Sequence, residues 1–295
     1  MATPEPETDV VAAGAETIAL TGDWLAAGEG GVWLSGETDI FRMDPATGRR
    51  VATIHVPEGP GEASDIGFGA LWTATIREPG IARIDPASNR VAAHIAVALP
   101  PRLGGEGSIG AGLGAVWVVT EGAGCDSCRV ARIDPAGGIV VASIPIEDGG
   151  AGVRVGEDRV WVTNPARDLV QEIDPSRDEV VRTTGVGPSP RFMAVGEGAA
   201  WTLNQGDGTI TRIDPATGDT TTIDAGVPGG GGDLTTGAGS VWARGSRRLL
   251  TRIDAETGAV AERYGPRSGS GAVILGFGAL WISAHDIDTV WRLRL

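Results

Sequence analysis

Three charged residues, Asp65, Arg154 and Asp233, stand out because the other copies of a repeated segment hold uncharged residues at the same places. Two aspartates can hold a divalent cation such as Mg²⁺ or Ca²⁺ through carboxylate oxygens. Together with Arg154, whose guanidinium forms directional hydrogen bonds, they can instead bind a small polar or anionic molecule. A third interpretation stays open, in which the three charges neutralise one another along a water-filled channel.

Aromatic and basic side chains accompany these charges. Trp24 departs from the register in which tryptophan recurs along the chain, and Phe192 directly follows Arg191. Aromatic rings give a ligand apolar contact area, while an arginine orients its polar end. The sequence therefore predicts a ligand site composed of Trp24, Asp65, Arg154, Arg191, Phe192 and Asp233.

His285 offers acid–base chemistry as an alternative to binding. It lies in the polar segment 283–288, and an imidazole can accept or donate a proton near neutral pH. With Asp233 as a second catalytic residue, and with Asp65, Asp233 and Glu62 as cation ligands, the protein would be a metal-dependent lyase or hydrolase. The same histidine can also be a solvated turn residue.

The only two cysteines, Cys125 and Cys128, lie three positions apart in a glycine-containing segment. One such pair cannot supply the four ligands of a structural zinc site, and the segment lacks the helix of redox-active pairs. We predict a disulfide at a loop tip, formed in an oxidising compartment. Free thiols and a redox pair are the alternatives.

The elements that must position these residues come from a repeat of roughly 40 residues. Its first half is a glycine five residues before a tryptophan, and its second half is an Asp-Pro segment such as Arg212 to Gly218. Short apolar-alternating runs between glycine and proline turns are typical of propeller blades, each a four-stranded sheet. The seven copies of the first half are Gly28/Trp33, Gly67/Trp72, Gly112/Trp117, Gly156/Trp161, Gly196/Trp201, Gly237/Trp242 and Gly276/Trp281.

The two ends of the chain complete one blade together. The last copy stops after its third strand, at 289–293, and residues 16–22 align with the fourth strand that it lacks. The sequence predicts an all-β, seven-bladed β-propeller with four-stranded antiparallel blades, in which an N-terminal strand completes the C-terminal blade and removes an open edge. We expect residues 1–14 to be a disordered N-terminal stub and residues 15–295 to form a single domain.

The recurring Asp-Pro is predicted to be a turn, because the aspartate side chain can cap free amides and proline presets φ. The arginine two residues before each of these aspartates lies on the same face of the third strand. We expect the arginine and aspartate to pair laterally between neighbouring strands.

The innermost strand of each blade determines where a site can lie. Side chains alternate along a strand, so the residues nine and seven positions before each repeated tryptophan are predicted to face the central channel. These positions hold Trp24, Phe192 and Asp233, and deeper Asp65 and Arg154. We expect the aromatics near the channel mouth, on the face where the fourth strand connects to the next blade and the second strand to the third.

Composition excludes several classes of function. The net charge is −14, and all 24 basic residues are arginines. A nucleic-acid partner requires a clustered basic surface, and a Schiff-base enzyme requires a lysine. No stretch approaches the ~20 apolar residues of a membrane span, and residues 1–8 lack the features of a signal peptide. We expect a monomeric, extracytoplasmic protein in its mature form.

The segments Gly112 to Val118 and Arg212 to Gly218 resemble the repeats of the seven-bladed YVTN-type β-propeller family, which is related to the streptogramin lyase (virginiamycin B lyase) family. The resemblance covers residues 16 to 295. It implies a binding protein, a sensor domain or, among the lyases, a magnesium-dependent enzyme whose site joins histidines and carboxylates on one face. His55 and His94 fall in outermost strands, which leaves only His285 placed for that chemistry.

These observations lead to one function and one alternative. We predict an extracytoplasmic ligand-binding or sensor propeller that recognises a small polar or anionic molecule, or a protein partner, at the channel mouth. The alternative is a streptogramin-lyase-like, metal-dependent lyase or hydrolase with its site on the same face.

Overall fold

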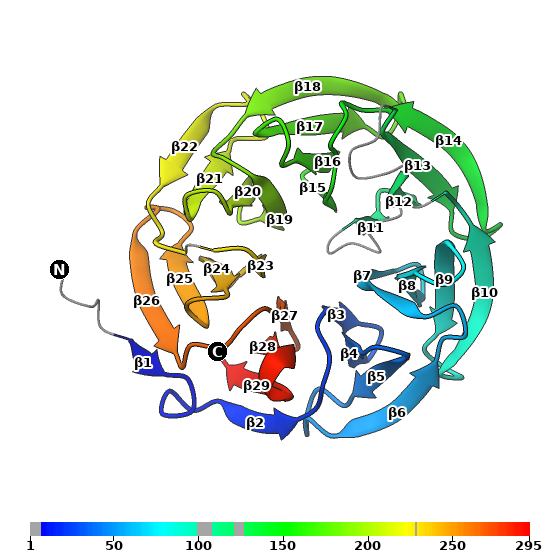
Figure 1. Cartoon of the computed structure of the whole chain (residues 1–295). Coiled ribbons are helices and arrows are strands. Elements are labelled where there is room, and N and C mark those ends of the chain that lie inside the picture. Colours follow the sequence, from blue (N-terminus) through cyan, green and yellow to red (C-terminus); the bar gives the residue numbers. More distant parts are fainter. Residues whose placement is uncertain (1–6, 99–107, 121–126, 228) are drawn as a thin grey trace.

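Seven sheets lie radially around a central axis in the computed structural model, which describes residues 7–98, 108–120, 127–227 and 229–295 (Figure 1). Consecutive strands within each sheet pair antiparallel, from the axis outward. Among the described residues, the one helical element is the 3₁₀ turn η1 (His285–Ile287). The predicted all-β, seven-bladed architecture is confirmed.

The strands of the first four blades, from the axis outward, are β3 (Leu25–Gly28), β4 (Gly31–Ser35), β5 (Asp39–Met43) and β6 (Arg50–His55); β7 (Pro60–Gly67), β8 (Ala70–Thr75), β9 (Gly80–Asp85) and β10 (Arg90–Ala96); β11 (Ile109–Gly112), β12 (Ala115–Thr120), β13 (Arg129–Asp134) and β14 (Ile139–Pro145); β15 (Val153–Gly156), β16 (Arg159–Asn164), β17 (Leu169–Asp174) and β18 (Glu179–Gly185). Those of the last three are β19 (Pro190–Gly196), β20 (Ala199–Asn204), β21 (Thr209–Ile213) and β22 (Thr220–Ile223); β23 (Gly232–Gly237), β24 (Ser240–Gly245), β25 (Leu250–Asp254) and β26 (Val260–Gly265); β27 (Val273–Gly276), β28 (Ala279–Ala284), β29 (Thr289–Arg294) and β2 (Glu16–Ala19).

The ring closes through β2, which pairs antiparallel with β29 in the last blade. Thr17 lies opposite Trp291, and the side chain of Arg292 forms an ion pair with Glu16 across the seam. The expected completion of the C-terminal blade by an N-terminal strand is confirmed. This pairing covers the edge of β29, which would otherwise be free to associate with another chain.

The segment before β2 is more ordered than the sequence suggested. A short strand, β1 (Thr8–Asp9), adds in parallel to β26 as a fifth strand of the sixth blade, and Val10 is fully buried. Val10 packs in a cluster with Tyr264 and Trp291. Apolar burial at Val10 is thus the physical reason why the predicted disordered stub at 1–14 is wrong for residues 8–10; residues 1–6 lie outside the described residues.

The repeated tryptophans form a layer between the blades, and all seven are at most 2 % exposed. Each indole N–H donates to the carbonyl of the glycine five residues earlier, over distances from 2.9 to 3.3 Å. That glycine is required because the next blade comes close: a Cβ at Gly237 would lie 2.1 Å from Leu275, and one at Gly276 would lie 2.5 Å from Ala27. The glycine-tryptophan unit therefore sets the spacing between neighbouring blades.

Arginines of the third strands link three of the blades to the next one. Arg42 lies 4.9 Å from the ring centre of Trp33 and donates to the carbonyl of Pro86 in the following blade. Arg132 and Arg292 make the same contacts. The expected lateral pairing with the nearby aspartates is therefore wrong, because the aspartates cap their own turns. Each accepts hydrogen bonds within the next three residues, as between Asp44 and Thr47.

The fourth blade replaces this arginine with Glu172, which is buried. Arg182 of the outermost strand takes over its role, since it donates to Glu172 and to the carbonyl of Pro215 in the next blade. Burial raises the pKa of Glu172, although Arg182 opposes the effect. The contact between blades is thus kept although the residue that makes it has moved to another strand.

Candidate functional site

A cavity of 190 Å³ lies in the central channel, where the innermost strands meet. Its polar wall consists of Asp65, Arg154, Asp233, Thr235 and Thr236, and its apolar wall includes the ring of Trp24. Of the six residues predicted to form a ligand site, four therefore line this cavity: Trp24, Asp65, Arg154 and Asp233. A cavity of about 150 Å³ can hold a benzene-sized molecule, so this one suits a small ligand.

Two aromatic rings close one end of the channel. The ring centres of Trp24 and Phe192 are 6.4 Å apart, although the residues belong to the first and fifth blades, and both side chains are buried. The sequence had placed these rings at an open mouth; the structure instead packs them against each other. Phe192 is consequently not among the residues that line the cavity.

Exposure along the inner strands shows which end is open. All residues nine positions before the repeated tryptophans are buried, whereas Asp65, Arg154 and Ile274, two positions further along, are partly exposed. These strands run from the buried ring pair toward the hairpin turns that join the first and second strands. The cavity therefore opens on the face of those hairpin turns, opposite to the face that the sequence analysis had favoured.

Arg154 connects the charged and aromatic parts of the cavity wall. Its Nη2 lies 3.8 Å from Oδ1 of Asp233, and its guanidinium lies 5.3 Å from the ring centre of Trp24. Its Nη1 donates to the carbonyl of Val153 at 2.9 Å. Trp24 is fixed in turn by its indole N–H, which donates to the carbonyl of Ser64 at 3.0 Å. The cavity wall is thus held in place before any ligand arrives.

Asp65 uses both carboxylate oxygens in contacts with backbone. Oδ1 accepts the N–H of Ile66 at 2.8 Å, and Oδ2 accepts the N–H of Ala111 in the next blade at 2.8 Å. Burial raises the pKa of Asp65, while these two hydrogen bonds and Arg154 lower it. Asp65 therefore joins two blades as well as contributing negative charge to the cavity.

Asp233 has one oxygen without a hydrogen bond. Oδ2 accepts the N–H of Val273 at 3.2 Å, whereas Oδ1 is buried and accepts no hydrogen bond. The residue is only 3 % exposed, and burial raises the pKa of Asp233 to about 6 against the opposing attraction of Arg154. The Arg154 guanidinium, 3.8 Å away, is the charged partner of Oδ1, so Asp233 contributes a buried, ion-paired carboxylate to the cavity wall.

The predicted Mg²⁺ or Ca²⁺ site at Asp65 and Asp233 does not fit this geometry. Three of the four carboxylate oxygens already accept a backbone N–H, and the fourth, Oδ1 of Asp233, faces Arg154. In the described part of the chain, the group of ligand atoms compact enough for a metal ion lies elsewhere, at Glu58, Glu78 and His94. A divalent cation in the channel would also have to share its space with the Arg154 guanidinium.

His285 lines a second cavity, of 300 Å³, on the opposite face of the propeller. Its Nδ1 lies 3.5 Å from Oδ2 of Asp23, and Glu62 belongs to the same wall. Burial raises the pKa of Asp23, although His285 and Arg244 lower it. Burial and the charge of Asp23 both raise the pKa of Glu62. Asp233 does not line this cavity, so the structure separates the two residues that had been considered a catalytic pair.

Arg191 belongs with this second group of residues. Its guanidinium lies 5.8 Å from the ring centre of Phe192, and its charge lowers the pKa of Glu62. It is not among the residues that line the channel cavity. The six residues of the predicted ligand site therefore divide between two faces, with the pair of Trp24 and Phe192 between them.

Two residues at or beside the second cavity, Arg244 and Asp23, were not among the site residues predicted from the sequence. Arg244 is fully buried and donates to the carbonyls of Ser268 and Ser283, and burial lowers the pKa of Arg244 to about 10. Ser283 lies near the end of β28, two residues before His285, so Arg244 fixes the strand end from which His285 follows. In the sequence, Arg244 differs from the equivalent residues of the other copies. It stands two residues after a repeated tryptophan, where those copies have small or apolar residues. Asp23 is less conspicuous in the sequence, where its one distinguishing feature is its position directly before Trp24.

Of the two cysteines, Cys128 lies within the described residues. Cys128 is buried at 1 % exposure and is disulfide-bonded. Its predicted partner, Cys125, lies outside the described residues. Across the described residues, no helix has the length and apolar character needed to pass through a bilayer.

Comparison with known proteins supports the fold. The chain has a TM-score of 0.75 with a streptogramin B lyase structure, at 17 % identity, covering 94 % of this chain and 96 % of that one. For virginiamycin B lyase from Staphylococcus aureus the TM-score is 0.78 at 17 % identity, with 95 % and 99 % covered. For BamB from Moraxella catarrhalis it is 0.66 at 12 % identity, with 94 % and 85 % covered.

At these identities the likeness concerns the fold, which this chain shares with a ligand-processing enzyme and with BamB. No family model matches the sequence. No curated protein matches it either.

Proposed function

We propose that this protein is an extracytoplasmic, monomeric binding propeller that holds a small polar molecule in the cavity of its central channel. The observation that carries the proposal is the charged wall of this cavity, in which Asp65 and Asp233 flank the single guanidinium of Arg154. A ligand that donates hydrogen bonds to this wall meets side chains that are already fixed, so little ordering is required on binding.

The charges of the cavity select the class of ligand. Two carboxylates, Asp65 and Asp233, share one guanidinium, so the wall is acidic whenever Asp233 is ionised. A neutral or cationic donor, such as an amine, an amide or a polyol, suits this wall better than the anion considered from the sequence. The ring of Trp24, already in contact with Arg154, offers an apolar surface for the remainder of the molecule.

Binding by a panel of free amines, amino acid amides and short polyols, measured by calorimetry, tests this function. We expect one ligand per chain and at least a tenfold weaker affinity in Asp233→Asn, whose amide presents a donor in place of an acceptor. Glu157→Gln changes an exposed charge near the hairpin turns and serves as the matched control. Equal affinity in wild type and Asp233→Asn, or binding of anions alone, would contradict the proposal.

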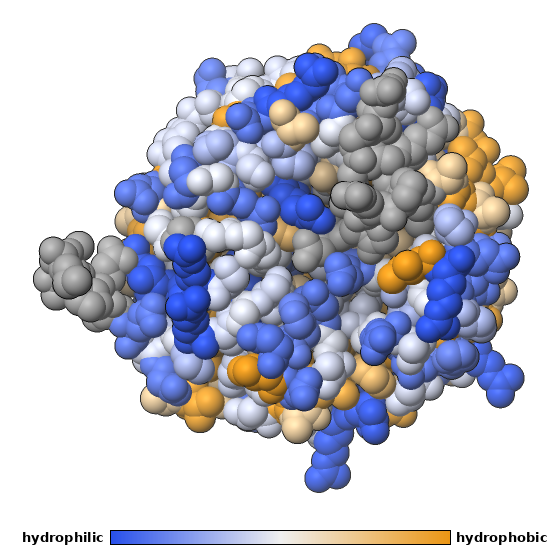
Figure 2. Space-filling model, viewed as in Figure 1, coloured by the Kyte–Doolittle hydropathy of each residue, from blue (hydrophilic) through white to orange (hydrophobic). Residues whose placement is uncertain are grey.

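The location outside the cytoplasm rests on the disulfide-bonded Cys128, because such bonds persist in oxidising compartments. A protein partner, as the likeness to BamB suggests, is a competing role for the same fold. The face in Figure 2 is mostly hydrophilic in its coloured residues, with hydrophobic residues mainly toward the rim. A large apolar patch would mark a stable protein interface, so the coloured part of this face does not favour such a partner.

A lyase activity is the second candidate, and the pair of Asp23 and His285 favours it. A histidine beside a half-buried carboxylate, with Glu62 on the same wall of a 300 Å³ cavity, can remove and return a proton during an elimination. The likeness to streptogramin B lyase makes streptogramin B compounds the first substrates to assay, with and without Mg²⁺. Turnover that disappears in His285→Asn would support this candidate, and unchanged turnover would exclude His285 from it.

A further inference from the structure

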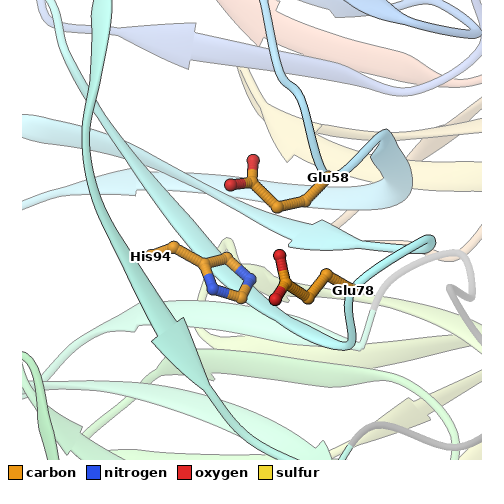
Figure 3. A group of neighbouring side chains, drawn as sticks. All are labelled: Glu58, Glu78 and His94. Atoms are coloured by element: carbon orange, nitrogen blue, oxygen red, sulfur yellow. The ribbon is translucent and has the colours of Figure 1, made fainter.

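Two glutamates and a histidine come together in the second blade, and none of the three lines either cavity. Glu58 lies between β6 and β7, Glu78 between β8 and β9, and His94 in the outermost strand β10. Each offers one ligand atom, and these atoms all lie within 4.8 Å of one another. Figure 3 shows the two carboxylates and the imidazole converging from three separate segments.

Backbone and side-chain hydrogen bonds hold these segments together. The N–H of Arg77 donates to the carbonyl of Glu58 at 2.7 Å, which joins the two glutamate loops. The hydroxyl of Thr75 donates to the carbonyl of Glu78 at 2.6 Å and lies 3.1 Å from Nε2 of His94. The three side chains are therefore brought to one place by a framework that does not depend on their own interactions.

One carboxylate oxygen of Glu58 lacks a partner in this framework. Its Oε2 is buried and accepts no hydrogen bond. The other two histidines of the chain each pair with a carboxylate, His55 with Asp39 at 3.1 Å and His285 with Asp23 at 3.5 Å. Within the described residues, His94 forms no such ion pair, although two glutamates surround it. A common ion between the three groups would satisfy them together.

We propose that Glu58, Glu78 and His94 form a binding site for a divalent first-row transition metal, represented by Zn²⁺. Imidazole nitrogen and carboxylate oxygen both bind Zn²⁺, and three protein ligands with water in the fourth position are typical of open zinc sites. The imidazole disfavours Mg²⁺ and Ca²⁺, which prefer oxygen ligands throughout. Tetrahedral ligands lie roughly 3.4 Å apart, so ligand atoms that are within 4.8 Å of one another can reach a common ion through small side-chain movements.

Two neighbouring residues make room for the ion and support it. A Cβ at position 80 would lie 2.5 Å from Nε2 of His94, so Gly80 leaves space for the ring. Thr75 contacts the ring in the way that hydroxyl and carbonyl groups orient metal-bound histidines. A bound metal would fasten two loops to the outermost strand. Those loops continue into Pro60 and Ile76, which line the cavity of His285.

Metal binding by the full chain tests the site directly, without any assay of activity. Protein freed of metal by chelator, kept without reductant so that the disulfide stays intact, is titrated with ZnCl₂ by calorimetry and melted with and without one equivalent. We expect one ion per chain and a rise in Tm of several degrees, because an ion that binds only the folded state stabilises it. MgCl₂ and CaCl₂ at the same concentration should leave the Tm unchanged.

Variants distinguish this site from adventitious binding. His94→Gln and Glu58→Gln should each weaken Zn²⁺ binding by about 10–100-fold and abolish the Tm rise. His55→Gln alters the equivalent outermost strand of the first blade and should bind Zn²⁺ like the wild type. Absence of 1:1 binding in the wild type, or equal binding in His94→Gln, would overturn the proposal.

Discussion

The tryptophan layer and the channel lining belong to the same seven blades, yet they differ in how strictly they repeat. Between the blades, every tryptophan is buried and donates to the carbonyl of the glycine before it. Along the channel, the residue nine positions before each repeated tryptophan varies in size from Gly152 to Trp24. Each boundary between blades poses the same packing problem, so one solution serves all seven. The axis is shared, and seven identical charges or rings could not occupy it together.

This difference separates stability from function. Departures from the repeat, such as Asp65, Arg154, Asp233 and Arg244, coincide with the cavities or their supports. The repeated positions hold the ring together. Four substitutions sharpen or break this comparison, and they follow in order of expected effect.

The largest effect is expected for Trp201→Ala, which removes one ring from the repeated layer. Trp201 is fully buried, and truncation of such a side chain costs about 4 kcal/mol in the free energy of unfolding. Urea denaturation measures this loss. Phe277→Ala, at a position 50 % exposed, should change stability by less than about 0.5 kcal/mol. A loss below about 1 kcal/mol for Trp201→Ala would show that the layer does not carry the fold.

Gly237→Ala tests the spacing between the sixth and seventh blades. The added Cβ would lie 2.1 Å from Leu275, and the backbone φ of +146° is one that side chains disfavour. Overpacking and strain together should cost about 3 kcal/mol, measured by the same denaturation. Gly185→Ala, where no atom lies within 4 Å of the new Cβ, provides the control and should be nearly neutral. Equal stability of the two variants would refute the argument from close approach.

Asp233→Asn tests the channel lining through its pH dependence. The ordinary pKa of 3.8 rises to about 6 in the folded protein, so between these values the folded state holds a proton that the unfolded chain has released. Raising the pH through this window therefore lowers the free energy of unfolding. The variant cannot titrate at this position, so above pH 6 its free energy of unfolding should exceed that of wild type by about 2 kcal/mol. This gain is smaller than the free energy that corresponds to the whole pKa shift, because the substitution also removes the attraction between Asp233 and Arg154.

The control for this comparison is Asp219→Asn, at an exposed position, which should keep the wild-type profile. Denaturation at a series of pH values from 4 to 7 measures all three proteins. A profile for Asp233→Asn that falls as steeply as that of wild type would assign the pH dependence to another group.

The smallest effect is expected for Arg132→Met, which removes one contact between blades. The arginine lies 5.4 Å from the ring centre of Trp117 and donates to Pro175 and Asp178 in the next blade. Because the side chain is partly exposed, its loss should cost only about 1 kcal/mol. Arg177→Met breaks an exposed pair with Glu179 and should cost less still. Equal denaturation midpoints would mean that the stacked arginines add nothing to the ring.

Much of the architecture was predictable because the same sequence pattern occurs in seven copies. The glycine-tryptophan pairs gave the number of blades, and the unfinished last copy with residues 16–22 gave the closure that β2 makes with β29. The stub was predicted less well, since Val10 looks unremarkable until Tyr264 and Trp291 are placed beside it. Local pattern cannot reveal burial that depends on a distant strand.

The sequence predicted which way the side chains of the site point, but not which of them contact one another. Strand alternation placed Asp65, Arg154 and Asp233 toward the channel, and all three line its cavity. It could not tell that Trp24 and Phe192 meet and close one end, because their separation depends on two blades that are not neighbours. For the same reason His94, dismissed as an outer-strand residue, gave no hint of Glu58 and Glu78 beside it.

The sequence by itself determined the blade, its turns and the number of copies, since these follow from hydrogen bonding and side-chain alternation over a few residues. Only the tertiary structure decided which departures from the repeat meet across the axis, which oxygen of Asp233 is left without a donor, and which face the cavity opens on. The physical reason is range: a strand fixes where a side chain points, whereas burial and charge pairing depend on residues that ring closure brings together from far apart in the chain.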